Sequence, residues 1–399
     1  MPRPAKVVVI GAGIGGLAAA CALRRAGAEV SIYEQAPAIG EVGAGIQITP
    51  NGVKALRGLG LEEEILKVGF RPQAIIGLDG LTGRETFRTP LTDSPRMYGA
   101  PYLQTHRAEL HEVLWRGAGV VPIHLGMRCA GARTEGASAI ARFADGTEVE
   151  ADLIVGADGI HSAVRRSVFS DEPARYTGTM CWRGIVPFDA PDFELVAPAT
   201  SAWFGPHGHV VTYWIRGGRG VNIVAVHETK TWQDESWSAR STREEMLAAY
   251  PGWHPRLLKL LGMSQDIFKW GLFDRDPMRS WSAGRVTLLG DAAHAMLPFL
   301  SQGAAMSLED GYVLGRLVGH GGADGVLAAL AAYERERLPR TSRVLLRARE
   351  QGRKNHLTSP MARLWRDAVY FAKGLLNPQK TGLGGDWLYE HDVTTMQST

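Results

Sequence analysis

The sequence has few cysteines, no block of like charges and no long continuous apolar run. Its three cysteines, Cys21, Cys129 and Cys181, are odd in number and widely spaced among 399 residues. This usage argues against a disulfide framework and against a metal site, and it favours a reducing, cytoplasmic environment. The charge is nearly balanced, with 44 basic and 41 acidic residues and a net charge of +3. We therefore expect a small-molecule partner rather than nucleic acid or a membrane surface.

The uncharged stretch 7–23 follows a basic start, which is the pattern of a secretory signal. Four glycines interrupt the stretch, so its apolar part is not continuous, and strand-like sequence follows the Arg24-Arg25 pair. We therefore expect this segment to be part of the folded protein, with the signal as the alternative.

Glycine is the residue in excess, with 48 of 399 positions against a usual level of about 7%. Proline contributes only 21 residues and no Gly-X-Y period is present, so the sequence is not of low complexity. The hydrophobic content of 45% is enough for a sizeable core. The glycines are therefore expected at specific turns and close contacts.

The amino-terminal glycines lie between a strand pattern and a helix pattern. The β-branched run Val7–Ile10 predicts a strand, Gly11–Gly16 has the spacing G-x-G-x-x-G, and a helical pattern runs from there to Gly27. A second strand, Glu29–Tyr33, ends at Glu34. This strand, helix and strand predict a dinucleotide-binding βαβ unit.

Each residue of the motif has a physical role in such a unit. Gly11 permits the tight turn, Gly13 lets backbone approach a pyrophosphate, and Gly16 allows the helix to pack closely on the strand. Glu34 is expected to bond the adenosine ribose hydroxyls. The alternative is a plain glycine cluster for helix packing. The motif alone does not separate NAD from FAD.

Two further clusters follow strands. In the first, Asp158-Gly159 lies at a strand-to-helix turn, for which a structural explanation is a capped helix start with Ser162 as the cap. In the second, a strand ends at Gly290-Asp291 and a helix with an apolar face begins at Gly303. An acid in that place is suited to sugar hydroxyls, and the helix amino terminus is suited to a buried anion.

These three motifs, in this order and spacing, resemble the single-component FAD-dependent aromatic hydroxylases, the group of para-hydroxybenzoate hydroxylase and salicylate hydroxylase. The resemblance implies an α/β fold in which a Rossmann-like, glutathione-reductase-like FAD-binding domain is interleaved with a mixed-sheet substrate domain and followed by C-terminal helices. It implies FAD-binding segments 1–70, 100–175 and 271–330, substrate-domain segments 71–99 and 176–270, and a C-terminal helical segment 331–399.

The resemblance also assigns FAD contacts residue by residue. Gly11, Gly13, Gly16 and Asp158 would serve the pyrophosphate, Glu34 and Gln35 the adenosine ribose region, and Cys129 the adenine. Arg107 and the segment 43–51, with Gly45, would contact the flavin, Asp291 would hold the ribityl chain, and Pro298, Gly303 and Ala304 would line the isoalloxazine edge. NADH or NADPH would bind only transiently, because no second nucleotide-binding βαβ unit is visible.

The region 176–270 alternates short apolar and polar runs, which predicts a mixed sheet over the flavin. His209 and Tyr213 lie four apart in one such run, so period-two alternation puts them on one face. From the residues alone, a pair on an ordinary sheet surface is the alternative. Family members acting on 3-hydroxybenzoate and 6-hydroxynicotinate resemble this chain at the pair, which implies that His209 takes a phenolic proton with Tyr213 as relay or hydrogen-bond partner.

Four further residues are candidates for substrate contact. Arg183 would bind a substrate carboxylate, or else be a structural cation of the sheet, and Trp203 would form part of an aromatic wall. Gln47 departs from the His of the 6-hydroxynicotinate enzymes, and Pro298 departs from the Gln of the 3-hydroxybenzoate pattern. A salicylate-like substrate is therefore favoured.

Two other groups have structural interpretations. His294, after the Gly-Asp turn, is expected to be a packed structural histidine. The arginines of 333–349 are expected to form a solvated basic face or a contact in a homodimer.

The resemblance implies a cycle in which hydride passes from NAD(P)H to FAD, O2 is captured as a C4a-hydroperoxide, and one oxygen is transferred to an ionised phenolic acid. Alternatives are a hydroxypyridine carboxylate as substrate, a non-hydroxylating flavoprotein oxidase or epoxidase, and a flavin binder without activity. A flavin halogenase is disfavoured because the sequence lacks its Trp-x-Trp-x-Ile-Pro segment.

Overall fold

A computed structural model describes residues 3–38, 40, 44–229, 239–376 and 385–395. In one helix, α12 (Pro360–Leu376), the side chains are described only as far as residue 372. Residue 43 of the predicted flavin segment, and 377–384 and 396–399 of the predicted C-terminal segment, lie outside the described residues. Among the described residues, we find no helix whose length and hydropathy together would let it span a bilayer.

The first layer is a six-stranded sheet in the order β18-β19-β11-β1-β2-β7. Its strands are β1 (Lys6–Ile10), β2 (Glu29–Tyr33), β7 (Ile123–His124), β11 (Leu153–Gly156), β18 (Ser282–Ala283) and β19 (Val286–Leu288). β1 pairs in parallel with β2 and β11, and only β18 is antiparallel. The βαβ unit is confirmed, because α1 (Ile14–Arg25) connects β1 to β2 and both the strand and the helix are buried. The signal-like stretch is thus part of this core.

Two helices meet closely beside this sheet because one of them presents small residues. Along α10 (Gly303–Gly321), Gly311, Gly315 and Gly319 are four residues apart and share one face. A Cβ on any of the three would approach atoms of α1 or Ala26 to 2.6 Å or less. Side chains at these positions would push α10 away from α1, so the glycines set the distance between the two helices.

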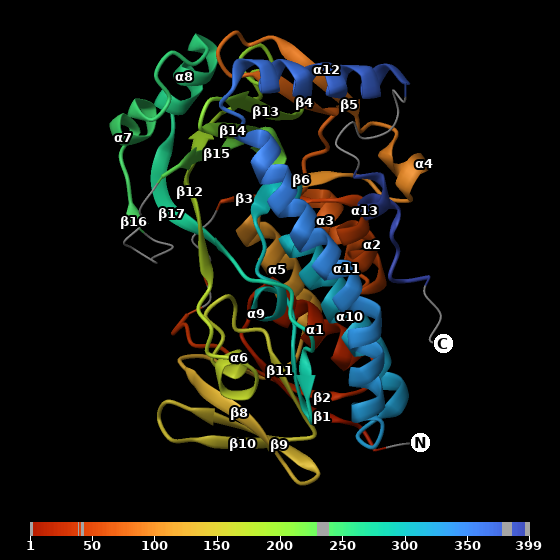
Figure 1. Ribbon diagram of the computed structural model, residues 1–399. Coiled ribbons are helices and arrows are strands. Elements are labelled where there is room, and N and C mark those ends of the chain that lie inside the picture. Colours follow the sequence, from red (N-terminus) through yellow and green to blue (C-terminus); the bar gives the residue numbers. More distant parts are fainter. Residues whose placement is uncertain (1–2, 39, 41–43, 230–238, 377–384, 396–399) are drawn as a thin grey trace.

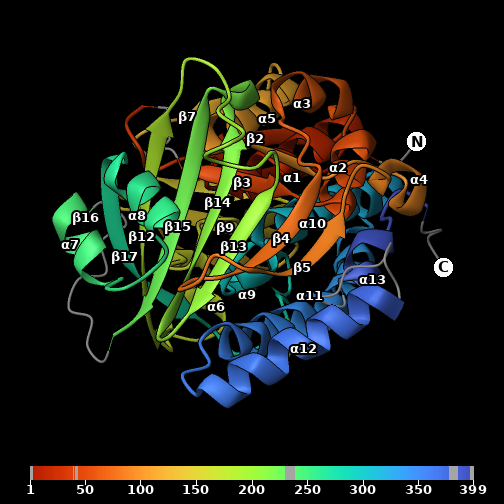
Figure 2. The same cartoon turned by 90° about the horizontal axis from the view of Figure 1, so that it is seen from above.

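The second layer is an eight-stranded mixed sheet in the order β16-β17-β12-β15-β14-β13-β4-β5. Its strands are β4 (Ala74–Asp79), β5 (Glu85–Pro90), β12 (Arg175–Pro187), β13 (Thr200–Gly205), β14 (Gly208–Ile215), β15 (Gly220–Glu228), β16 (Ala239–Arg240) and β17 (Gln265–Asp274). One face packs on α7 (Arg243–Ala248) and α8 (Pro255–Gly262) in a core of Trp, Tyr and aliphatic side chains. Figure 2 shows these helices outside the sheet and the first layer on its other side.

The remaining elements connect and cover the two layers (Figure 1). They are β3 (Gly45–Ile48), α2 (Pro50–Gly58), α3 (Glu62–Val68), α4 (Ser94–Tyr98), β6 (Leu103–His106), α5 (Arg107–Ala118), β8 (Cys129–Glu135), β9 (Ser138–Phe143), β10 (Glu148–Ala151), α6 (Ala163–Val168), η1 (Arg216–Gly218), α9 (Asp291–His294), η2 (Pro298–Leu300), α11 (Val326–Asn355) and α13 (Asp386–Glu390). β3 pairs with β6, and β8 to β10 form a separate three-stranded sheet. α11 continues from the first layer towards the second, and α12 packs on β5.

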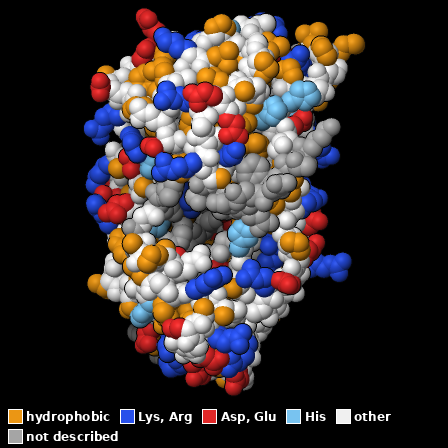
Figure 3. All heavy atoms as spheres, turned by 90° about the vertical axis from the view of Figure 1, so that its left-hand side faces the viewer, with side chains coloured by type: hydrophobic (Ala, Val, Ile, Leu, Met, Phe, Trp, Pro, Cys, Tyr) orange, Lys and Arg blue, Asp and Glu red, His pale blue; other side chains and the backbone are white. Residues whose placement is uncertain are grey.

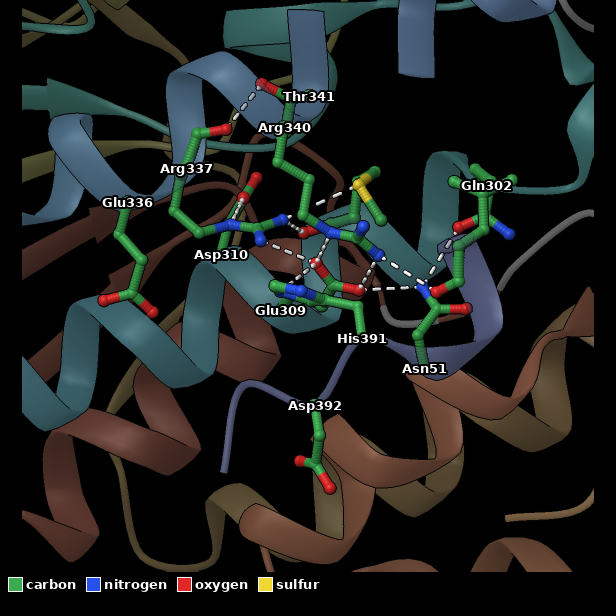
Figure 4. Close-up of polar contacts among 12 residues, drawn as sticks. Asn51, Gln302, Glu309, Asp310, Glu336, Arg337, Arg340, Thr341, His391 and Asp392 are labelled. Carbon is green, nitrogen blue, oxygen red and sulfur yellow. Dashed lines mark hydrogen bonds and ion pairs between the residues drawn. The ribbon is translucent and has the colours of Figure 1, made fainter. Parts of the chain in front are cut away.

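A buried charge cluster joins α10 to α11 (Figure 4). Arg337 lies 2.6 Å from Glu309 and 2.8 Å from Asp310, and Arg340 lies 2.8 Å from Glu309. The fully buried Glu309 has its pKa held well below the usual value by these arginines, against the effect of burial. The expectation of a solvated or dimer-forming basic face is therefore wrong for Arg337 and Arg340, whose charges are used inside the molecule.

His294 belongs to the same cluster. Its Nε2 lies 2.5 Å from Asp310 and its side chain is buried. This contact fits the structural interpretation of His294.

Candidate active site

One cavity of about 1280 Å³ extends between the two layers. Its wall includes the glycine turn before α1, the amino terminus of α10, and the face of the eight-stranded sheet opposite α7 and α8. On the face of the molecule shown in Figure 3, the surface is hollowed at mid-height, between the two layers. The cavity exceeds the usual size of a site for one drug-sized ligand, so it has room for more than a single aromatic ring.

The glycine turn has the shape that a bound pyrophosphate requires. Gly11 has a φ of +103°, and a Cβ there would lie 2.5 Å from the Ala157 carbonyl oxygen. A Cβ on Gly16 would lie 2.0 Å from the Gly11 carbonyl oxygen. Gly13 differs, because a Cβ there would meet nothing within 4 Å and the residue lines the cavity. Gly11 and Gly16 thus serve internal packing, and Gly13 leaves open space beside the N–H groups that begin α1, which fits a dinucleotide phosphate.

The residues predicted around the adenosine lie at the end of β2 and in β8. The Glu34 carboxylate accepts hydrogen bonds from the backbone N–H groups of Ala12 and Ala36, at 2.7 and 2.9 Å. Gln35 lines the cavity, whereas Glu34 and Cys129 are not part of its wall. The Cys129 thiol faces its own strand, at 3.5 Å from the Gly131 carbonyl oxygen. Both carboxylate oxygens of Glu34 keep a lone pair for a further donor.

Asp158 lines the cavity and also caps α6. Its carboxylate accepts from the Ser162 hydroxyl at 2.5 Å and from the Ala163 N–H at 2.7 Å. Ser162 in turn caps the helix, as the structural interpretation of this turn expected. Burial raises the pKa of Asp158, and these hydrogen bonds oppose the rise. The carboxylate therefore holds the shape of the turn. Gly159, with a φ of +75°, lines the cavity with backbone atoms that no side chain covers.

The predicted flavin end brings together residues from four segments. Arg107, Asp291, Pro298, Gly303 and Ala304 all line the cavity. Burial raises the pKa of Asp291, and the nearby charges of His294 and Arg107 oppose the rise.

Gly45 lies on the β3 side of this region. Its N–H donates to Asn222 Oδ1 at 2.6 Å, and a Cβ there would lie 2.7 Å from the Tyr213 ring. Position 45 thus has no room for a side chain, and β3 can approach the eight-stranded sheet.

His209 and Tyr213 lie on the cavity face of β14. Val211, midway between them, pairs with Val224 of β15, and Val224 pairs with Arg183 of β12. Across the sheet, Arg183 is therefore level with the midpoint between His209 and Tyr213. Residues four apart in a strand are about 13 Å apart along its axis. The structure contains no hydrogen bond between His209 and Tyr213, and they therefore flank the middle of the wall rather than form one contact pair.

The environments of the two residues differ. Burial, the nearby His356 and the Arg366 cation lower the pKa of His209 well below its usual value, so its imidazole is neutral at pH 7. Burial raises the pKa of Tyr213 to about 12, so its phenol keeps its proton and can donate a hydrogen bond. His209 is thus the proton acceptor of the two, and Tyr213 is a donor.

Two of the other predicted substrate contacts line the same wall. The guanidinium of Arg183 lies over the Trp270 ring, at 5.1 Å from its centroid, and its buried Nε has no acceptor among the described residues. A substrate carboxylate would supply that acceptor. Gln47 accepts a hydrogen bond from the Tyr102 hydroxyl.

The structure corrects the prediction for Trp203. In β13 the even-numbered residues Thr200, Ala202 and Phe204 line the cavity, so Trp203 points to the opposite face. There its ring stacks on His254 and lies under Arg256, within the core beneath α8. Trp203 therefore contacts no ligand in this cavity.

A further histidine next to the cavity wall, His356, lies at the end of α11. Its Nε2 lies 2.8 Å from His209 Nδ1, although the two residues are 147 positions apart. No local motif marks His356, because only the course of α11 brings it to the sheet.

The fold and the cavity together are those of a dinucleotide-dependent oxidoreductase. A Rossmann-like sheet with an open glycine turn and a mixed sheet line one cavity, which has room for a dinucleotide and a small substrate. The chain belongs to the FAD-binding-domain family, whose model matches residues 4–348. Within it, the chain is an FAD-dependent monooxygenase of the aromatic hydroxylase type, as its resemblance to salicylate hydroxylase and related enzymes predicted.

Three comparisons support this assignment. The chain is 42% identical to the 3-amino-4-hydroxybenzoate 2-monooxygenase PtnB3 of Streptomyces platensis over 89% of each chain. It is 36% identical to the 6-hydroxynicotinate 3-monooxygenase of Bordetella bronchiseptica, over 85% of this chain and 89% of that one. HpxO of Klebsiella pneumoniae, solved with FAD and uric acid, is similar in structure with a TM-score of 0.82 and 26% identity, covering 98% of this chain and 96% of HpxO.

Proposed function

We propose that the protein hydroxylates the ring of a phenolic aromatic acid, with FAD as resident cofactor and with O2 and NADH or NADPH as co-substrates. The observation that carries this proposal is the continuity of the cavity, which runs from the open glycine turn at Gly13 to the wall formed by Arg183, His209 and Tyr213. The overall reaction consumes the aromatic acid, O2, NAD(P)H and a proton, and it yields the hydroxylated acid, water and NAD(P)+.

We infer that the six-stranded sheet binds FAD and that the eight-stranded sheet binds the substrate, with the segment boundaries predicted from the sequence. The residues that would hold FAD are Gly13 and Asp158 at the pyrophosphate, with Gly11 and Gly16 shaping that turn, Glu34, Gln35 and Cys129 near the adenosine, and Gly45, Arg107, Asp291, Pro298, Gly303 and Ala304 towards the flavin. When bound, FAD supplies the redox chemistry, and the chain supplies orientation, proton transfer and exclusion of water.

The substrate's carboxylate pairs with Arg183, whose Nε has no acceptor among the described residues. This contact places the ring over the middle of the wall, between His209 and Tyr213. His209 accepts the phenolic proton, because it is the neutral base of the pair. The ionised ring is richer in electrons than the phenol and is the better acceptor of an electrophilic oxygen. The side of the substrate ring that faces away from His209 contacts Tyr213, Gln47 and Pro298.

The names of the relatives support a carboxylated substrate with a ring hydroxyl. The relatives named above act on an aminohydroxybenzoate and on a hydroxynicotinate, which share a carboxylate and a hydroxyl on a six-membered aromatic ring. A hydroxybenzoate is the preferred class, including salicylate-like acids, and a hydroxypyridine carboxylate is the second candidate because of the 36% identity to the hydroxynicotinate enzyme.

A substrate panel tests the proposal. NADH and NADPH oxidation by the FAD-loaded protein is measured with salicylate, 3-hydroxybenzoate, 3-amino-4-hydroxybenzoate and 6-hydroxynicotinate, and the products are identified by mass. We expect at least one acid to stimulate oxidation and to gain one oxygen atom. Benzoate is the matched control, because it has the carboxylate but no ionisable hydroxyl. Equal oxidation rates with every acid and with none would contradict the proposal.

A further inference from the structure

His209 is not isolated at the cavity wall, because a line of titratable groups connects it to the surface. His209 Nδ1 lies 2.8 Å from His356 Nε2, and His356 Nδ1 lies 3.8 Å from Glu228 Oε1. The other carboxylate oxygen of Glu228 lies 3.1 Å from His207 Nδ1. Exposure rises along the line, from the buried His209 and His356 to side-chain values of 39% for Glu228 and 59% for His207.

We propose that His356 and Glu228 form a proton relay that positions the His209 tautomer and carries the substrate's proton from the cavity to solvent. This inference rests on the proposed function, in which His209 accepts that proton. Three elements build the relay: β14 holds His209, the end of α11 holds His356, and the last residue of β15 is Glu228.

The carboxylate decides which nitrogens carry hydrogen. Its negative charge favours the proton of neutral His356 on Nδ1, the nitrogen that faces it. The Nε2 of His356 is then an acceptor, so the 2.8 Å contact requires that His209 donates through Nδ1. His209 Nε2 is left with a lone pair, which is the form a general base requires. The separation of 3.8 Å exceeds a direct hydrogen bond, so transfer from His356 to Glu228 passes through one water or follows a small side-chain rotation.

Aromatic rings hold the two imidazoles and limit their contact with water. Phe299 meets His209 and His356 edge-on, with centroid distances of 5.2 and 5.8 Å. Phe204 stacks on the His209 ring at 6.3 Å. With these rings around it, the His209 Nδ1–H has the His356 nitrogen as its partner.

Each transfer in the relay balances. The phenolic O–H bond breaks and an N–H bond forms at His209 Nε2, while the Nδ1 proton of His209 passes to His356 Nε2. The Nδ1 proton of His356 then passes to Glu228 and on to solvent. The same transfers in reverse return one proton to the product's oxygen and restore the starting tautomers.

Burial is the main reason that both histidines are neutral at rest. Burial lowers the pKa of His356 to about 4; Glu228 opposes the shift and His227 adds to it. Burial, His356 and Arg366 lower the pKa of His209. Neither histidine therefore traps the proton, and it moves on to the exposed carboxylate.

Nuclear magnetic resonance tests the positioning role without turnover. In histidine-labelled holoenzyme without substrate, assigned with the variants His209→Gln and His356→Gln, we expect His209 and His356 to carry hydrogen on Nδ1. Substituting Glu228→Gln is expected to shift His356 towards the Nε2–H form, whereas Glu228→Asp preserves Nδ1–H. An Nε2–H form of His209 in the wild type would overturn the proposal whether or not the protein hydroxylates any compound.

Turnover tests the relay itself, with the acid that the panel identifies. In His356→Gln the amide oxygen still accepts from His209 but cannot pass a proton on, so kcat is expected to fall about 10- to 100-fold with KM within about twofold. Imidazole added to His356→Ala is expected to restore rate in proportion to its free-base fraction. His227→Gln is the control for a purely electrostatic effect on His356, because His227 adds to the lowering of the His356 pKa but packs on Trp182 and Tyr250 on the opposite face, and its kcat is expected to stay within about twofold of the wild type.

The outcomes separate the two proposals. A wild-type kcat and pH profile in His356→Gln, together with loss of hydroxylation in His209→Gln, would overturn the relay and leave the proposed function intact. Absence of hydroxylation by the wild type on every compound would overturn the proposed function, and the tautomers would still decide the positioning role.

Discussion

Replacing Gly13 of the amino-terminal turn by alanine is expected to weaken FAD binding without disturbing the fold. At Gly13 the backbone has a φ of −71°, which alanine adopts without strain, and a Cβ there meets nothing within 4 Å. The unfolded chain loses about 0.4–1 kcal/mol of entropy through the substitution, and alanine is a poorer helix cap than glycine by roughly 0.5–1 kcal/mol, so the two effects largely offset each other. The stability of the apoprotein should therefore change by less than about 1 kcal/mol.

The same methyl group occupies space beside the amino terminus of α1, where the proposal places the pyrophosphate. Loss of about one charge-assisted hydrogen bond costs roughly 1.5–3 kcal/mol, which corresponds to a roughly 10- to 150-fold weaker affinity for FAD. FAD binding is measured by fluorescence titration of the apoprotein, and stability by thermal unfolding of the same preparation.

Gly16→Ala is the matched variant in the same turn. Its Cβ would lie 2.0 Å from the Gly11 carbonyl oxygen, so α1 has to move away from β1. We expect it to lower the unfolding temperature of the apoprotein, at a cost of at least about 1–3 kcal/mol. Wild-type FAD affinity in Gly13→Ala, or equal loss of apoprotein stability in both variants, would refute the division of roles between the two glycines.

Four other perturbations have defined outcomes. Arg337→Met leaves buried carboxylates of Glu309 and Asp310 without this partner, so denaturant unfolding should show a loss of about 3–5 kcal/mol; a loss below 1 kcal/mol would contradict the cluster's role. Trp203→Phe should lower the unfolding temperature and leave the substrate KM unchanged, since its ring faces away from the cavity; a raised KM would restore Trp203 to the site. Arg183→Met should raise KM for the carboxylated substrate about tenfold or more, and a similar rise with an uncharged phenol would argue against a carboxylate contact. The pKa of His356 is lowered to about 4 from a usual 6.5, so between these pH values protons bind His356 more readily in the unfolded chain than in the folded one. The contribution of His356 to stability is therefore complete above pH 6.5 and is lost as the pH falls towards 4. His356→Gln should flatten the pH dependence of unfolding in that window, and an unchanged slope would count against the lowered pKa.

The parts of the fold with local periodicity were predictable from the sequence. The β-branched run, the glycine spacing and the following amphipathic pattern determine β1, α1 and β2 within a few residues, because each signal lies within one short segment. The alternation in β14 likewise predicted that His209 and Tyr213 share a face. That face lines the cavity.

Two errors have different physical causes. Aromatic character alone predicts Trp203 at the cavity, but alternation in β13 places it on the face opposite Ala202 and Phe204. Which of the two faces meets the ligand depends on the packing of α8. A surface position is predicted for Arg337 and Arg340, but Glu309 and Asp310 are buried acids of α10 and require buried cations. The contact of His356 with His209 had no sequence signal, since it depends on where a 30-residue helix ends.

The most direct test of the central claim is the fate of the oxygen atoms. The FAD-loaded wild-type protein is given the preferred phenolic acid, NAD(P)H and 18O2, and the product is analysed by mass. We predict one 18O atom on the aromatic ring for each NAD(P)H consumed, and little ring labelling in His209→Gln at equal FAD content. Hydrogen peroxide in the amount of NAD(P)H consumed, with the aromatic acid recovered unchanged, would contradict the account.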